Sequence, residues 1–348
     1  MSSMFVKSAI LLVSCLLVSC SKSEAPQRVV GAGSSMPNPI IQTWIKEFNR
    51  SHPDVSLEYQ SVGSGEGIRR FLAGEVDFAS SSAALTDQEI AQVERGADLI
   101  PISAGLIVLA YHLPGFGDGI KLPRSVYPEV FLGKPVKWND PRIQAVNPEL
   151  DLPNADIQPV VRRGTSGTTY AFTNHLSAIS QQWRESGLGV ARLIDWPNAM
   201  AVHYNPGSAQ RVKVSENALG YMEYSIARYA NLNVAALENQ AGEYVLPSRA
   251  SGEASLASTP MSLNEHMRIF IADPTGSDNY PIIAFSWLLT YHQYHDPVKL
   301  DAISDLIHWG LGEGQQQAEQ IGFIPLPEPM IKKSKQVLDK LVLIEQSH

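Results

Sequence analysis

Four segments of the chain share one pattern, in which apolar residues at strand spacing lead into a loop of glycine and hydroxyl residues and then into a helix. In the second segment, Val55, Leu57 and Tyr59 alternate with polar residues, as in a half-buried strand. Ile68 and Phe71 then mark one face of the following helix. The four loops are residues 31–37, 63–67, 80–82 and 164–169. The pattern predicts four turns at which a strand ends and a helix begins.

Other stretches add to this outline. Residues 106–111 include no charged side chain, which predicts a strand in the interior of a parallel sheet. Residues 157–161 predict a buried strand, and a helical pattern follows the fourth loop as far as Leu176. Thr86 and Glu89 have the spacing of a helix capping box. Residues 242–260 show no such pattern and are expected to form a mobile surface stretch.

Alternation of strands and helices is typical of an α/β fold with largely parallel sheets. Ligands of such sheets bind beyond the carboxyl ends of the strands, where all four loops are expected. The fourth loop follows Arg162 and Arg163, so backbone N–H groups, hydroxyls and a guanidinium gather at one point, as in an anion site. Each loop alone fits an ordinary capped turn, but four of them favour a shared anion site.

The sequence gives little support for an enzyme or for a nucleic-acid-binding protein. Residues 31–36 lack the third glycine of a dinucleotide fingerprint, and the sequence has neither a Walker loop nor a Gly-x-Ser-x-Gly elbow. Ser166 has no His or Asp partner that the sequence assigns. His292 and His295 lack a nearby third ligand and are more typical of a helix surface than of a metal site. We expect no catalytic residue, no metal and no cofactor.

The composition indicates a globular protein. The chain has 348 residues, which is long enough for two domains. Its 44% hydrophobic and 18% charged residues are typical of a protein with a sizeable core. The net charge of -8, without any basic run, argues against a nucleic-acid partner.

The N-terminus has the pattern of an export signal. Lys7 precedes an apolar run at 9–18 that is too short to span a bilayer. The run ends in Leu17-Val18-Ser19-Cys20, which is similar to the lipobox of bacterial lipoproteins, where the cysteine is acylated and becomes the new N-terminus. Cys15 ends a similar tetrapeptide, but cleavage there would leave a very short apolar core. We expect residues 1–19 to be the signal peptide and 20–27 a lipid-anchored tether.

Removal of residues 1–19 takes away the +1 of Lys7, so the net charge changes from -8 to -9. Because Cys15 and Cys20 are the only cysteines, the mature chain has no internal disulfide.

Several motifs together resemble the periplasmic phosphate-binding proteins of ABC transporters, over nearly the whole mature chain. The matching segments are Gly31-Ala32-Gly33-Ser34-Ser35-Met36-Pro37, Val62-Gly63-Ser64-Gly65, Val76-Asp77-Phe78-Ala79-Ser80-Ser81, Gly133-Lys134, Lys137-Trp138-Asn139-Asp140, Ser166-Gly167-Thr168-Thr169, Leu219-Gly220-Tyr221, Tyr280-Pro281-Ile282, Gly314-Gln315, Ile321-Gly322-Phe323 and Pro325-Leu326-Pro327.

The resemblance implies the two-lobed, type II periplasmic binding protein fold, with mixed, mostly parallel sheets and a hinge. It places residues 28–102 and 280–348 in one lobe and 103–279 in the other, with crossovers near Ile102 and Tyr280. It implies a monomeric, extracytoplasmic protein that captures inorganic phosphate, delivers it to a membrane permease, and touches the membrane only through its lipid. The implied phosphate-binding residues are Ser35, Met36, Ser64, Ser82, Arg163, Ser166, Gly167 and Thr168, with Cys20 as the lipidated residue.

The sequence departs from the family pattern at two places. Ser82 stands where the family has an aspartate that accepts the proton of hydrogen phosphate, so either the Ser82 hydroxyl or Glu66 is expected to act as acceptor. The carboxylate that orients the family's arginine is also absent, which leaves Arg162 and Arg163 as alternatives. A site of donors alone favours a fully deprotonated anion such as sulfate.

Alternative functions therefore stay open. One is a receptor for another tetrahedral oxyanion, sulfate or arsenate. The other is a sensor or adhesion lipoprotein without a transport role, and Ser21 bears on it, because a residue other than Asp after the lipidated cysteine commonly allows sorting to the outer membrane.

Overall fold

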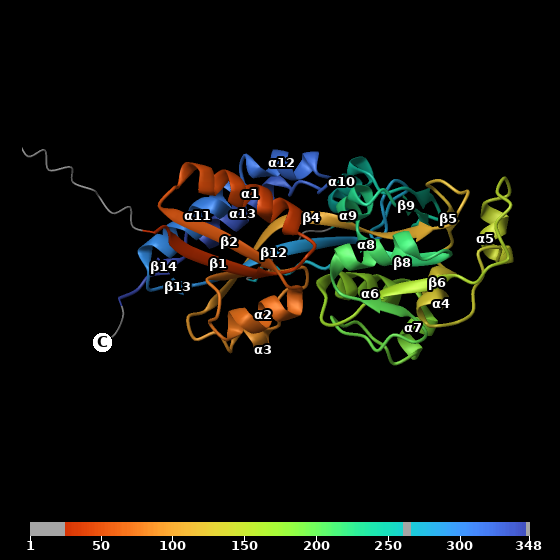
Figure 1. Cartoon of the computed structure of the whole chain (residues 1–348), viewed down its shortest axis with the longest axis horizontal. Helices are drawn as coiled ribbons and strands as arrows, with labels where there is room; N and C mark the ends of the chain where they lie inside the picture. The colour runs from red at the N-terminus through yellow and green to blue at the C-terminus, as the bar shows by residue number, and fades with distance from the viewer. Residues whose placement is uncertain (1–24, 260–265, 346–348) are drawn as a thin grey trace, which may run out of the picture.

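The computed structural model describes residues 25–259 and 266–345, and shows an elongated molecule whose two halves are joined by a nine-stranded mixed sheet (Figure 1). The main path of the sheet is β2 (Val55–Ser61), β1 (Gln27–Gly33), β3 (Phe78–Ser81), β12 (Ile283–Tyr291), β4 (Ala97–His112), β8 (Ala218–Glu223), β6 (Gln158–Arg162) and β7 (Met200–Val202), with β9 (Asn233–Val234) paired to β4. The smaller sheets are β11 (Tyr244–Val245), β10 (Ala236–Glu238) and β5 (Lys121–Leu122), and β13 (Gln293–Tyr294) with β14 (Val342–Leu343).

Helices surround each half of the sheet. Those of the half that contains β1 are α1 (Asn38–Ser51), α2 (Ser64–Leu72), α3 (Asp87–Ile90), α11 (Pro297–Gly310), α12 (Gly314–Gln320) and α13 (Glu328–Leu338). Those of the half that contains β8 are α4 (Tyr127–Phe131), α5 (Pro141–Val146), α6 (Gly167–Ile179), α7 (Gln181–Glu185), α8 (Tyr204–Val214), α9 (Tyr224–Tyr229) and α10 (Arg249–Ala257). None of the helices within residues 25–259 and 266–345 has the length and apolar character needed to cross a bilayer.

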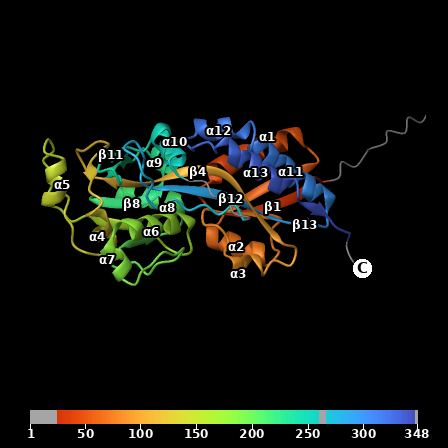
Figure 2. The ribbon, with the colours of Figure 1, turned by 180° about the vertical axis from the view of Figure 1, so that it is seen from behind.

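Strands β4 and β12 run from one half to the other, as the view from behind also shows (Figure 2). Residues 97–106 of β4 pair with β12, whereas residues 107–112 pair with β8. Both pairings are antiparallel, so the expectation of a parallel neighbour for residues 106–111 was wrong. An uncharged apolar run reports burial on both faces of the strand, but it carries no information about the direction of its neighbours.

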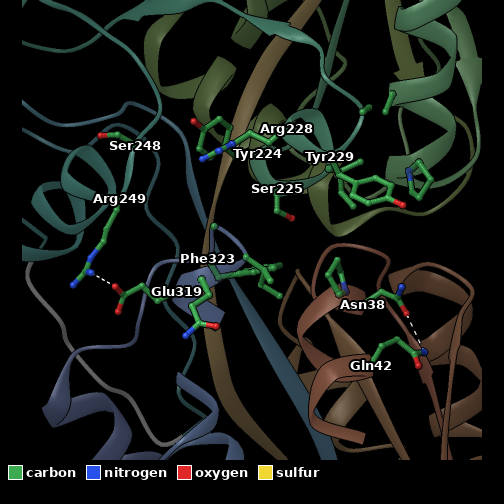
Figure 3. A pocket seen from close by; sticks show the side chains of 18 of the residues that line it. Asn38, Gln42, Tyr224, Ser225, Arg228, Tyr229, Ser248, Arg249, Glu319 and Phe323 are labelled. Atoms are coloured by element: carbon green, nitrogen blue, oxygen red, sulfur yellow. Dashed lines mark hydrogen bonds and ion pairs between the residues drawn. The ribbon is translucent and has the colours of Figure 1, made fainter. Parts of the chain in front are cut away.

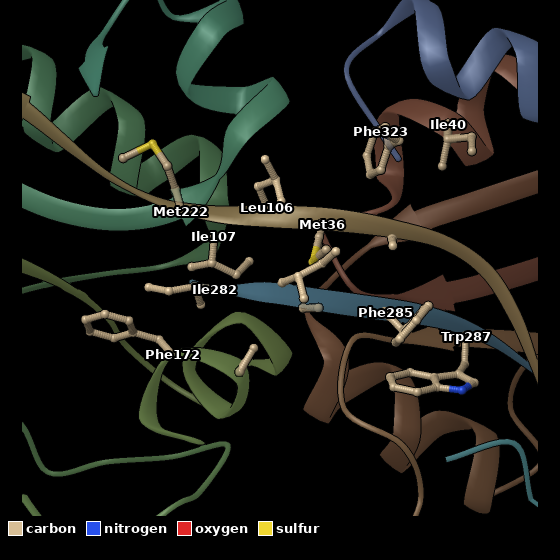
Figure 4. Packing of buried hydrophobic residues seen from close by; sticks show 14 of the residues in the cluster. Met36, Ile40, Leu106, Ile107, Phe172, Met222, Ile282, Phe285, Trp287 and Phe323 are labelled. Carbon is tan, nitrogen blue, oxygen red and sulfur yellow. The ribbon is translucent and has the colours of Figure 1, made fainter. Parts of the chain in front are cut away.

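The junction between the halves is packed with apolar side chains (Figure 4). Met36, Leu106, Phe285 and Met222 are each 2% exposed or less, and they come from four different segments of the chain. Burial on this scale contributes roughly 1.5–3 kcal/mol for each large side chain. The core is therefore continuous across the two strands that join the halves.

Most predicted helix and strand positions are confirmed. Thr86 and Glu89 form the expected capping box at the start of α3. The helix after the fourth loop is α6, which begins at Gly167 and continues past Leu176 to Ile179. The interpretation of residues 242–260 was wrong, because they contain β11 and helix α10, whose capping box is supplied by Ser248.

Helix α2 lies unusually close to β1. A methyl group added at Gly67 would stand 2.4 Å from the Cα atom of Gly33 and 2.9 Å from the carbonyl oxygen of Ala32. Backbone atoms cannot move aside as a flexible side chain can, so only glycine allows this approach. The same contact fixes the position of Ser64, the first residue of α2.

We predict that Gly67→Ala lowers the free energy of unfolding by about 1–3 kcal/mol, because the helix must be displaced from the strand. Gly117→Ala is the matched control, since nothing lies within 4 Å of the added methyl group there. Urea denaturation of both variants measures the difference, and equal midpoints would contradict the packing described for Gly67.

Candidate anion-binding site

The four loops meet at one buried place between the two halves of the molecule. The Oγ atom of Ser64 accepts hydrogen bonds from the backbone N–H groups of Gly167, at 3.2 Å, and Ser82, at 3.3 Å. These three residues belong to three different loops. We use the name anion cage for a set of residues that are all buried, namely Ser35, Met36, Ser64, Ser82, Arg162, Ser166, Gly167 and Thr168.

Helix starts account for much of the cage. Ser64 is the first residue of α2, and Gly167 and Thr168 are the first two residues of α6. Ser166 caps α6, because its Oγ accepts the N–H of Thr169 at 3.3 Å. The first N–H groups of a helix lack partners inside it, and the helix dipole places partial positive charge there. The cage thus faces the amino ends of two helices from opposite halves.

Glycine is required where the halves touch. A methyl group at Gly167 would lie 2.5 Å from the carbonyl carbon of Ser82 and 2.8 Å from the Oγ of Ser64. A side chain at this position would therefore hold the loops apart.

Arg162 is the one charged residue among those named for the cage. It is the last residue of β6, its side chain is 3% exposed, and its Nε and Nη1 atoms have no hydrogen-bond partner among the described residues. Burial lowers its pKa to about 10, so the guanidinium remains charged at pH 7. A buried and unpaired cation of this kind is costly unless an anion joins it.

The structure separates Arg162 from Arg163, the residue preferred from the sequence, by burial. Arg163 is exposed, since the residues of a strand alternate between its two faces and the chain leaves β6 after Arg162. Of the pair, Arg162 alone is buried.

Ser82 is surrounded by other hydroxyl groups. Its Oγ lies 2.9 Å from the Oγ of Ser34 and 2.9 Å from the Oγ of Ser286 on β12. Because a hydroxyl both donates and accepts, this group is adaptable where a carboxylate would accept only.

Glu66, the other expected acceptor, is turned to the surface. It forms ion pairs with Arg69 at 2.9 Å and Arg70 at 2.7 Å, and these hydrogen bonds lower its pKa to about 2. Its charge is already matched by two arginines of its own helix, which argues against a role in the cage.

Two residues near the cage were missed by the sequence analysis. Asn205, near the start of α8, hydrogen-bonds Ser35 and Thr168, and it is 1% exposed. Glu223, at the end of β8, is fully buried, and burial raises its pKa to about 7. Neither belongs to a glycine-rich loop, and the only signal for Glu223 was a charged residue at the end of an apolar stretch.

An ion pair joins the halves beside the cage. Arg192 contacts Glu89 of α3 at 2.6 Å, with both side chains about four-fifths buried. The carbonyl oxygen of Arg192 also accepts the N–H of Ser166 at 2.7 Å. The same residue therefore supports the fourth loop and links it to the other half.

A groove of about 1030 Å³ lies elsewhere on the molecule (Figure 3). Its one side is formed by α1 and residues 319–323, and its other side by α8, α9 and the start of α10. Arg249 and Glu319 form an ion pair across it. None of the cage residues lines this groove. Across residues 25–259 and 266–345, no group of three His, Cys, Asp or Glu side chains could hold a metal ion.

Comparison with known proteins gives a consistent result. Residues 21–312 match a family model described as a PBP superfamily domain. The chain is 33% identical to the phosphate-binding protein PstS of Xylella fastidiosa (strain 9a5c), over 88% of this chain and 83% of that protein. It is 32% identical to PstS of Pasteurella multocida (strain Pm70), over 93% of both chains.

Solved structures show the same fold at lower identity. A high-affinity periplasmic phosphate-binding protein (PfluDING), solved with bound phosphate, superposes with a TM-score of 0.72 at 18% identity, covering 89% of this chain and 93% of that one. A phosphate-binding protein from Stenotrophomonas maltophilia gives a TM-score of 0.68 at 18% identity, with the same coverage. The expected two-lobed periplasmic binding protein fold is confirmed.

Proposed function

Because the chain belongs to the PstS family of phosphate-binding proteins, we propose that it captures inorganic phosphate in the anion cage and delivers it to the permease of an ABC transporter. The observation that carries this proposal is the buried guanidinium of Arg162, whose Nε and Nη1 atoms lack a hydrogen-bond partner among the described residues, at the end of the strand that leads into the loop and helix start of α6.

Phosphate suits this arrangement physically. A small dianion with four oxygens satisfies many donors at once, and hydrogen bonds between ionised groups and buried donors are strong. The cage offers N–H groups, hydroxyls and one cation, and it needs no chemistry to do so. The relatives are named for binding rather than for a reaction, so we propose capture and release without turnover.

We propose that residues 28–102 and 280–348 form one lobe and residues 103–279 the other. Pairing of β4 with β12 on one side and with β8 on the other supports a hinge in these strands. Ser35, Ser64 and Ser82 then face the ion from one lobe, whereas Arg162 and residues 166–168 face it from the other. Rotation about the hinge would open the cage for entry and release.

We also propose that the mature protein is a periplasmic, monomeric lipoprotein anchored through Cys20. The signal peptide and Cys20 lie outside the described residues, so the support is the lipobox-like sequence and the similarity to PstS proteins. If the anchor lies in the outer membrane, a sensor or adhesion role would account for it better than delivery to an inner-membrane permease.

We predict that Arg162→Ala weakens phosphate binding by at least about 100-fold, which corresponds to about 3 kcal/mol, because the ion loses its only charged partner in the cage. Arg163→Ala is the matched control and should bind within about threefold of the unaltered protein. Isothermal titration calorimetry with phosphate measures both. Loss of binding in Arg163→Ala with retention in Arg162→Ala would contradict the site.

Selectivity is expected to be weaker than an acceptor carboxylate would give. With hydroxyls around Ser82, sulfate should compete with phosphate, whereas Ser82→Asp should raise the preference for phosphate over sulfate at least about tenfold, because a carboxylate accepts the proton of hydrogen phosphate and repels sulfate. Competition titrations at pH 7 test this. If sulfate fails to displace phosphate from the unaltered protein, the Ser82 region already provides an acceptor, and the broader oxyanion alternative is removed.

We predict that replacing residues 1–20 with an export signal that is cleaved without lipidation releases the protein from membranes into the soluble periplasmic fraction, because the polar tether without its lipid has no membrane affinity. Separation of inner and outer membranes shows which one carries the unaltered protein. A protein exported without residues 1–20 that remains with the membranes would contradict anchoring at Cys20.

A further inference from the structure

Asn205 connects hydroxyl groups that belong to the two proposed lobes. Its backbone N–H donates to the Oγ of Ser35 at 3.2 Å, and its side-chain Nδ2 donates to the same Oγ at 3.3 Å. Nδ2 also donates to the Oγ1 of Thr168 at 3.2 Å. One amide thus contacts two cage residues, one on the first loop and one at the start of α6.

The orientation of the Asn205 amide is fixed by a hydrogen bond to its oxygen atom. The Oδ1 atom of Asn205 accepts the backbone N–H of Glu223 at 3.3 Å, which an amide nitrogen could not do. With Oδ1 turned toward Glu223, Nδ2 faces the two hydroxyls. A hydrogen bond in the reverse sense, from the Thr168 hydroxyl to Oδ1, spans 3.5 Å and is longer than the 3.2 Å bond from Nδ2.

The number of hydrogen bonds that a hydroxyl already accepts determines where its proton can point. A serine hydroxyl accepts two hydrogen bonds and donates one. The Oγ of Ser35 already accepts two from Asn205, so its proton is the only function left for another partner. The Oγ1 of Thr168 likewise accepts from Nδ2. The hydroxyl of Ser35 is therefore set to donate, and that of Thr168 is free to donate while it accepts from Nδ2, which is the role that an anion requires.

The backbone before Asn205 supports this placement. Tyr204 has φ of +60°, a conformation that costs a residue with a side chain about 1 kcal/mol or more. The turn brings Asn205 to the start of α8, where its N–H lacks a partner within the helix and is free to reach Ser35.

We propose that Asn205 is a positioning residue for anion capture, which holds the hydroxyls of Ser35 and Thr168 as proton donors toward the bound ion and couples their orientation to closure of the lobes. The inference rests on the proposed function. It assigns no contact between Asn205 and the ion, since Asn205 acts through the two hydroxyls.

A double-mutant cycle tests the proposal. We expect Asn205→Ala to weaken phosphate binding about tenfold and Ser35→Ala by a similar factor, as measured by calorimetry at pH 8. Because Asn205 acts through Ser35, the two losses should overlap. The double variant should bind phosphate at least threefold more tightly than expected if the two factors of weakening simply multiplied. Losses that multiply independently would overturn the proposal. Thermal melting without phosphate is expected to leave each variant folded at 25 °C.

Asn205→Asp gives a second readout. Aspartate has nearly the shape of asparagine but accepts where the amide donates, so the hydroxyl protons would turn toward it and away from the ion. We expect Asn205→Asp to bind phosphate at least tenfold more weakly than Asn205→Ala. A residue needed only to fill space would give the opposite order, and that order would overturn the proposal.

The outcome for the unaltered protein separates the two proposals. If it fails to bind phosphate, the proposed function fails, and the inference fails with it. Two results would refute only the role of Asn205 if the unaltered protein binds phosphate. One is that the losses of Asn205→Ala and Ser35→Ala multiply; the other is that Asn205→Ala binds phosphate more weakly than Asn205→Asp.

Discussion

The structure depends on the cost of leaving the guanidinium of Arg162 buried without a counter-charge. Burial lowers its pKa only to about 10, so the group stays charged and the cost remains at pH 7. Its Nε and Nη1 atoms have no hydrogen-bond partner among the described residues, and the carboxylates of Glu66 and Glu89 are bonded to other arginines. An anion is the one partner that relieves this cost, and it satisfies the helix starts of α2 and α6 in the same place.

The two-lobed construction follows from the same constraint. Donors drawn from loops far apart in the sequence are brought together only because β4 and β12 carry the chain between the halves. The contact of Ser64 with Gly167, the bonds of Asn205 to Ser35, and the pair of Arg192 with Glu89 all cross between these halves. The same few contacts therefore join the two halves at the cage.

Local patterns predicted much of this molecule, because helix starts, caps and glycine turns are encoded by neighbouring residues. The capping box of Thr86 and the loop that begins α6 are examples. The pattern could not give the antiparallel neighbours of β4, the choice between Arg162 and Arg163, or the role of Asn205. Those depend on which distant segments lie opposite, and α10 was missed because its Ser, Ala and Gly residues give a weak apolar periodicity.

The central claim is that groups from both lobes enclose one oxyanion, and a crystal structure of the mature protein grown with phosphate tests it most directly. The account predicts a single tetrahedral density bonded to the guanidinium of Arg162, to Ser35 and Ser64 from one lobe, and to residues 166–168 from the other. Phosphate bound by one lobe alone, or at another place with Arg162 still unpaired, would contradict the account.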